Sequence, residues 1–175
     1  ARNEFKYEIQ AFYEIPRDTA WSTEVEKIVK TLSELNEYYG LTDGFKLRCG
    51  GVEAALFPSP CEIAVAINTC REFEIPLKFT AGLHHPVRHY SENVKTKMYG
   101  FFNIFIGGML SFKHYLNNDS LEEIITDEDA SNFQFFEAGI SWKNLELTHK
   151  DIPNLRSCAL ISYGSCSFDE PREDL

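Results

Sequence analysis

The sequence lacks a hydrophobic run long enough to cross a membrane. Its most apolar stretch, residues 98–112, is shorter than the roughly 20 residues that a spanning helix needs, and two glycines interrupt it. We therefore expect a buried helix there and no membrane partner. The first residues also lack the charged, apolar and small-residue pattern of a secretory signal, so we expect a cytoplasmic protein.

Basic residues are also scarce. The 175 residues include 17 Lys and Arg against 27 Asp and Glu, which gives a formal net charge of −10. Nucleic acids and anionic membranes select clustered cations, and the sequence has no run of Lys or Arg. The composition thus predicts no nucleic-acid partner, although it leaves room for a local basic pocket.

Cysteine and histidine do not form a recognisable metal motif. The five cysteines are odd in number and include no CxxC pair, which favours free thiols over a disulfide framework or a zinc ribbon. No HExxH motif occurs, so we predict no metal and no cofactor. A metal-dependent hydrolase or lyase built on His84, His85 and Glu170 is the weakest hypothesis, because adjacent side chains of a strand point apart.

Alternating strand and helix patterns predict one α/β domain over residues 1–175. Strands are expected at 6–15, 45–49, 77–81 and 159–163, and a β-hairpin at 133–142. Helices are expected at about 23–38, from Ser59 onward, and at 98–116, 119–126 and 148–157. A complete (βα)8 barrel needs about 250 residues. We therefore expect a partial (βα) barrel or an open, mainly parallel sheet flanked by helices, with the hairpin inserted.

Charged residues lie on one face of each predicted strand. Lys46 and Arg48 share a face of the second strand, Lys78 and Thr80 share one on the third, and Glu14 ends the first. Burying an unpaired charge is costly, and ligands bind at the carboxyl ends of strands in α/β folds. These residues are therefore candidates for a site. The alternative is an open sheet on which they are ordinary solvated side chains.

The loops after the strands add further candidates. His84 and His85 follow the third strand and could act as acid/base groups, whereas we expect surface or packing roles for His89, His114 and His149. Backbone N–H groups in tight turns can bind anions, and such turns are predicted at Gly50, Gly51, Gly164 and Ser165.

Asn103 lies in the apolar segment, where a buried amide needs hydrogen-bond partners. It either contacts a ligand or caps a helix.

Four ordered segments resemble the motifs of an uncharacterised bacterial family with a (βα)-barrel-like fold. They are FKLRCGG (45–51), KFTAGLHHP (78–86), GFFN (100–103) and GSCSFDEP (164–171). The resemblance covers about residues 10–175 and implies that the chain is the C-terminal part of a longer barrel. The family pattern has threonine at Cys49 and histidine at Tyr99, so acid/base chemistry at Tyr99 is in doubt here.

The segment KFTAG is also similar to the one that carries the Schiff-base lysine in class I aldolases of the deoxyribose-phosphate aldolase type. The order of the motifs differs from that family. The similarity implies that Lys78 is the nucleophile and that Lys46 helps to keep it neutral.

Two hypotheses lead from these residues. The first is an enzyme acting on a small anionic carbonyl or phosphorylated metabolite. Lys78 would be its nucleophile or electrostatic stabiliser, Lys46 and Arg48 would bind the anion, and Glu14 or His84 would be the acid/base group. The second is a non-catalytic ligand-binding or assembly domain, in which an uncovered edge or barrel seam favours a homo-oligomer.

Overall fold

A parallel four-stranded sheet forms the centre of the protein. The computed structural model describes residues 9–16 and 21–164. Within them the strands lie side by side in chain order, each parallel to its neighbour: β1 (Phe12–Tyr13), β2 (Gly44–Arg48), β3 (Leu77–Thr80) and β9 (Leu160–Gly164). Such an order, with right-handed crossovers, places successive helices on the same face of the sheet.

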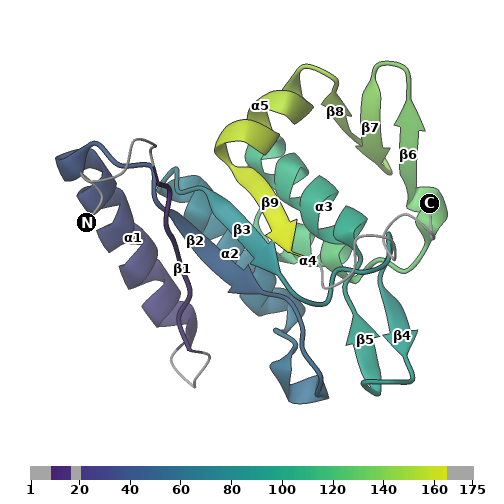
Figure 1. Ribbon diagram of the computed structural model, residues 1–175. Helices are drawn as coiled ribbons and strands as arrows, with labels where there is room; N and C mark the ends of the chain where they lie inside the picture. Colours follow the sequence, from purple (N-terminus) through teal and green to yellow (C-terminus); the bar gives the residue numbers. More distant parts are fainter. Residues whose placement is uncertain (1–8, 17–20, 165–175) are drawn as a thin grey trace.

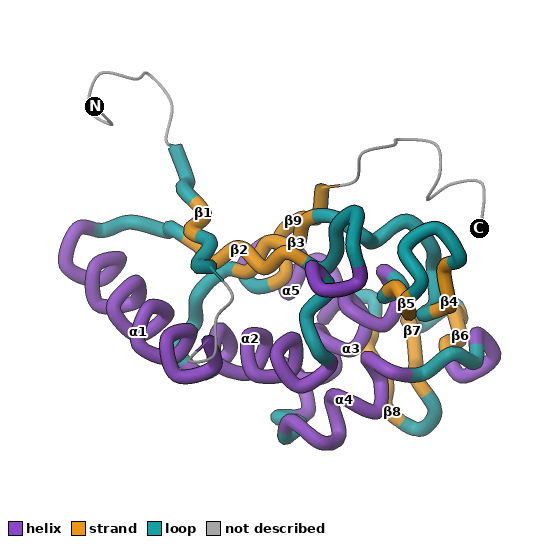
Figure 2. Tube along the Cα trace, turned by 90° about the horizontal axis from the view of Figure 1, so that it is seen from below, coloured by secondary structure: helices purple, strands orange, loops and turns teal. Residues whose placement is uncertain are grey.

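Helices cover one face of this sheet (Figures 1 and 2). Figure 2 shows them on a single side of the strands: α1 (Trp21–Tyr39), α2 (Pro60–Glu72) and α3 (Phe101–His114), with α4 (Asn118–Thr126) beyond them. Among the described residues, no helix covers the opposite face. The prediction of an α/β fold with a parallel sheet flanked by helices is confirmed.

Strand alternation decides which side chains reach the core. Phe45, Leu47, Leu77 and Phe79 are at most 2% exposed and point toward the helices. The residues between them, including Lys46, are partly or fully exposed on the other face. The face that packs against the helices therefore provides the hydrophobic stabilisation of the sheet, and the other face remains polar.

Local sequence signals account for the main helices. In α1 the buried residues Val25, Val29 and Leu32 recur at three- and four-residue spacing. At the start of α2, the Ser59 side chain accepts a hydrogen bond from the Glu62 backbone N–H, and the Glu62 carboxylate accepts one from the Ser59 N–H. This capping box satisfies two donors that the first helical turn leaves unpaired.

The first strand is shorter than predicted. Its regular part covers only Phe12–Tyr13, and residues 6–8 of the predicted strand lie outside the described residues. One physical reason is Asp43, whose carboxylate accepts a hydrogen bond from the Ala11 N–H at 2.9 Å. A side chain thus takes the place of a backbone partner before the ladder begins.

The long connection between β3 and β9 departs most from prediction. The expected hairpin at 133–142 is part of a three-stranded antiparallel sheet, and a further hairpin, β4–β5, was not predicted. The elements are β4 (His89–Ser91), β5 (Thr96–Met98), β6 (Phe133–Phe136), β7 (Gly139–Trp142), β8 (Leu145–Thr148) and α5 (Asp151–Cys158). Three-residue polar strands have too little alternation for a sequence pattern to detect.

Most of the apolar segment at residues 98–112 forms a helix, as predicted. This helix, α3, begins at Phe101. The backbone N–H groups of Phe101 and Phe102, which have no partner within the helix, donate to the carbonyls of His85 and Pro86. Most of α3 is buried within the fold. No helix in the described part of the chain is long and apolar enough to cross a membrane.

Candidate functional site

A hollow of about 700 Å³ lies where the central strands end. In Figure 1 the arrowheads of β2, β3 and β9 point toward the side of the molecule that carries the β4–β5 hairpin. The hollow is lined from these elements by Arg48, Gly51, Val52, Ala81, Gly82, His84, His85, Ser91, Asn93, Val94, Met98 and Gly164. Five predicted site residues, namely Arg48, Gly51, His84, His85 and Gly164, therefore share one hollow.

The charge of this lining is unusual for so acidic a chain. The sequence has 27 Asp and Glu residues, yet none of the described lining residues is acidic. Arg48 carries the only permanent charge among them, and its Nε donates a hydrogen bond to the Gly50 carbonyl at 2.9 Å. That bond orients the guanidinium and leaves its other N–H groups for an anion.

Close backbone packing shapes the floor of the hollow. A Cβ on Gly82 would lie 2.9 Å from the Gly50 Cα, and Gly82 has a left-handed φ of +74°. Ala81, beside it, also has a positive φ of 60°. Such backbone conformations cost about 1–3 kcal/mol in residues with a Cβ and often accompany functional loops. The loops after β2 and β3 can thus approach each other only because both glycines lack side chains.

Replacing Gly82 by alanine should therefore destabilise the fold by about 2–3 kcal/mol, since the new methyl group adds a backbone clash to the left-handed strain. Gly40→Ala is the matched control, because Gly40 has a φ of +63° and nothing within 4 Å of its would-be Cβ. The control should lose only about 1 kcal/mol. Urea denaturation measures both losses, and equal losses would show that the Gly82–Gly50 contact is unimportant.

The predicted lysines lie on the uncovered face of the sheet and do not line the hollow. Lys46 and Lys78 occupy neighbouring strands in register, with Ser162 of β9 as the next partner. Lys46 pairs with the Glu14 carboxylate at 2.5 Å, and its side chain is 31% exposed. Lys78 places its Nζ 5.6 Å from the centre of the Phe12 ring and forms no ion pair with a described residue.

Thr80 connects these two groups of residues. It is in register with Arg48 on one side and Gly164 on the other, both of which line the hollow. Lys78 lies two residues earlier on the same face of β3. Two residues of a strand span about 7 Å, so the lysine pair lies one layer of side chains below the hollow.

His89, which was expected to be a surface or packing residue, packs against a second histidine. Its ring lies 4.1 Å from the ring of His85, measured between centroids, in an edge-to-face arrangement. His85 and His89 are four residues apart, an HxxxH spacing that the sequence reasoning missed and that could have identified the pair. Because His85 lines the hollow, a second imidazole supports the acid/base candidate.

Asn103 does not belong to this group of residues. It is fully buried, and its amide donates to the carbonyls of Ile124 and Asp127 at 2.8 Å each. Its carbonyl oxygen accepts from the Arg88 N–H, also at 2.8 Å. Both N–H groups of the amide are thus used within the fold. The ligand role predicted for Asn103 is replaced by a structural one, which ties α3 to the end of α4.

The other described residues singled out in the sequence do not line the hollow. Gly50 is buried beneath the hollow and contributes the carbonyl that orients Arg48. Ser165 lies outside the described residues. Tyr99, where the resembled family has histidine, is buried and donates its hydroxyl to the Pro58 carbonyl at 2.6 Å. Burial raises the pKa of the Cys49 thiol well above its ordinary value, so this thiol stays protonated and is a poor nucleophile.

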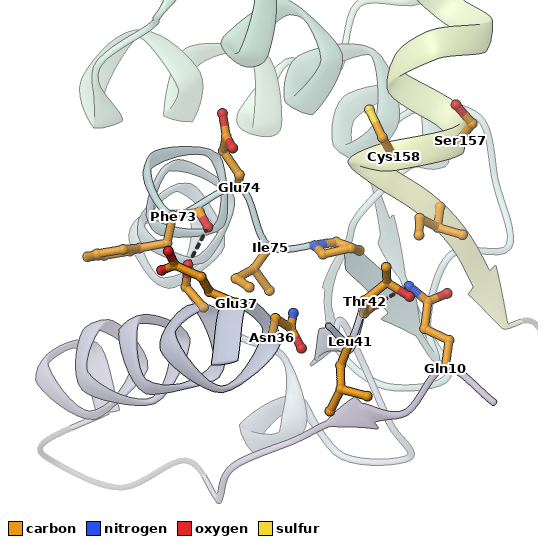
Figure 3. A pocket seen from close by; sticks show the side chains of 13 residues that line it. Gln10, Asn36, Glu37, Leu41, Thr42, Phe73, Glu74, Ile75, Ser157 and Cys158 are labelled. Carbon is orange, nitrogen blue, oxygen red and sulfur yellow. Dashed lines mark hydrogen bonds between the residues drawn. The ribbon is translucent and has the colours of Figure 1, made fainter. Parts of the chain in front are cut away.

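A second hollow, of about 720 Å³, lies at the opposite ends of the strands (Figure 3). Residues that precede the strands line it, and their polar groups are largely engaged in the fold. Ser33 donates to the Phe73 carbonyl, Gln10 to the Thr42 carbonyl, and the Asn36 amide exchanges two bonds with the Asp43 backbone. The amino ends of barrel strands usually serve stability, so this hollow is the weaker candidate.

No described group of three or more His, Cys, Asp or Glu side chains is arranged to hold a metal ion. Comparison with protein-family models, curated proteins and solved structures finds no match for this chain. The resemblances noted in the sequence therefore stay predictions, and the candidate site is argued from its own geometry.

Proposed function

We propose that the protein binds a small anionic metabolite, carboxylated or phosphorylated, in the hollow at the carboxyl ends of β2, β3 and β9. The observation that carries this proposal is the lining itself. It has an oriented arginine, two histidines and three glycines but no described acidic residue, in a chain of net charge −10. An anion there gains charge-assisted hydrogen bonds from Arg48 and meets no like charge from the lining.

The proposed fold context is half of a (βα) barrel. Sequential parallel strands with helices on one face are the arrangement found in such barrels, and their ligands bind at this end of the strands. The glycines allow a ligand to approach the backbone closely, because no Cβ stands in the way.

We further propose that the site is enzymatic and acts on a carbonyl group. His84 or His85 would move protons at the hollow, and Lys78 would attack the carbonyl carbon from the layer below. The Lys46–Glu14 ion pair supports this role, since it engages the Glu14 carboxylate, and Lys78 has no ion-pair partner among the described residues. The alternative is a non-catalytic binding or assembly domain, which the uncovered sheet face favours.

Anion binding is tested by titrating the protein with inorganic phosphate and with pyruvate in a calorimeter. Hydrogen bonds to a charged group contribute about 1.5–3 kcal/mol, so Arg48→Gln should weaken binding by roughly ten- to a hundredfold. Lys150→Gln makes the same change of charge on an exposed residue outside the hollow and should leave the affinity unchanged. Equal affinities for wild type and Arg48→Gln would refute the proposed site.

A further inference from the structure

The uncovered face of the sheet is unusual for parallel strands. Parallel sheets are almost always covered on both faces, yet the described residues cover only one. Among the described residues, the uncovered face carries Lys46, Arg48 and Lys78, and the Glu14 carboxylate pairs with Lys46. Both outer strands, β1 and β9, also have only one strand neighbour within the described sheet. Unpaired edges of this kind need a partner or a cover.

Among the described residues, the helical layer is also incomplete at the edge of the sheet formed by β1. A groove of about 640 Å³ lies between β1 and α1, and its lining includes Ile15, Ile28, Leu35, Tyr39 and Leu41. Leu35 is 44% exposed and Tyr39 is 64% exposed, although both lie on a helix whose other side packs in the core. In a barrel this position would be occupied by the neighbouring strand and helix. Within the part of the chain that the structure describes, the strand layer and the helix layer thus both lack a neighbour beside β1 and α1.

We propose that two copies of the chain associate head to tail and close one eight-stranded barrel around the candidate site. The strand β9 of each protomer would lie parallel to β1 of its partner. Four strands in sequential order are half of the eight that close such a barrel. A head-to-tail contact that closes after two copies forms a two-fold ring, so no edge remains open.

The inference rests on the proposed function and adds to it, because the site is incomplete in one copy. Closure would place the carboxyl end of the partner's β1 beside β9, so that loops from both copies surround the ligand. It would also turn the lysine-bearing face into the barrel interior. Of the described residues named on that face, three are cations and one is a carboxylate, which gives these four an excess of two positive charges per copy. Because these charges repel across the interior, a bound anion should favour the closed dimer.

Sedimentation equilibrium of the full chain, with and without inorganic phosphate, tests this inference. The expected mass is twice 20.1 kDa, and phosphate should tighten the association. Leu35→Glu places a charge in the groove and should weaken dimerisation about tenfold or more. Phe136→Glu is the matched control, because Phe136 is 43% exposed on β6, outside both the groove and the central sheet, and should leave the dimer intact. Circular dichroism checks folding, and Tyr39→Glu repeats the test at a more exposed position.

Two results would overturn the inference. One is a wild-type monomer at all concentrations, with or without phosphate. The other is a dimer that Phe136→Glu disrupts and Leu35→Glu does not. Phosphate binding by a monomer would refute the dimer and support the proposed function. A dimer that binds neither phosphate nor pyruvate would support the dimer and count against the proposed function.

Discussion

Treatment with a carbonyl metabolite and borohydride should attach the metabolite covalently to Lys78. The same treatment of Lys78→Arg should give no adduct at this position. The amine of Lys78 would attack the carbonyl carbon, and loss of water would give an imine. Hydride from borohydride would then reduce the C=N bond to a secondary amine, with a proton taken from water. The arginine variant keeps the positive charge but does not form this adduct. Peptide mass mapping after treatment with pyruvate or glyceraldehyde 3-phosphate measures the effect.

The contacts and position of Lys78 distinguish it from the lysines that form ion pairs, so we expect it to be labelled more strongly than they are. Its Nζ lies over the Phe12 ring, and it has no described ion-pair partner. Lys113 and Lys97, by contrast, pair with Asp151 and Glu128. No described carboxylate engages the Lys78 amine, and a carbonyl metabolite bound in the hollow one side-chain layer above would be held near it.

A second variant tests the role of the neighbouring ion pair. Lys46→Gln frees the Glu14 carboxylate, which could then pair with Lys78 on the adjacent strand. The yield at Lys78 should therefore fall, whereas Lys150→Gln should leave it unchanged. Equal labelling of Lys78 and Lys150 in the wild type would argue against a Schiff-base role and leave binding as the function to pursue.

Replacing Asn103 by alanine should cost about 3–5 kcal/mol of stability. The change removes the Asn103 partner of the Asp127 carbonyl and of the Arg88 N–H, and one of the two donors to the Ile124 carbonyl, which also accepts from the Asp127 N–H. Each buried group without a partner costs roughly 1–3 kcal/mol. Because small domains are stable by only about 5–15 kcal/mol, the variant should be close to unfolding at elevated temperature.

Urea unfolding followed by circular dichroism measures this loss. Asn132→Ala is the matched control, because its side-chain amide makes a single bond, to the Asp127 carboxylate at 2.8 Å. The control should lose about 1 kcal/mol. If both variants lost the same amount, Asn103 would not be the structural link between α3 and α4, and a ligand role for it would have to be reconsidered.

Much of the fold could be predicted because periodicity and capping act locally. The apolar spacing of Val25, Val29 and Leu32 indicates α1, and Ser59 and Pro60 indicate the start of α2. The short polar hairpin β4–β5 could not be predicted, because its strands depend on pairing with each other more than on their own composition.

The candidate site was predicted in part for a similar reason. Strand alternation alone places Lys46 and Arg48 on one face, and the structure agrees. Alternation does not indicate where along the strands a cavity begins. Of the charged residues predicted on the strands, Arg48 lines the hollow, whereas Lys46 and Lys78 lie one layer of side chains below it. The burial of Asn103 and the contact between His85 and His89 depend on segments that pack from elsewhere in the chain.

The sequence by itself determined the parallel α/β class, the acidic overall charge and the identity of the polar face, because each depends on composition or on a two-residue alternation. Only the tertiary structure decided which of those polar residues share a hollow. Strand register, the close approach of Gly50 and Gly82, and the β4–β5 hairpin together place Arg48, His84 and His85 around one space that lacks described acidic residues. Those are contacts between distant segments, and no local pattern encodes them.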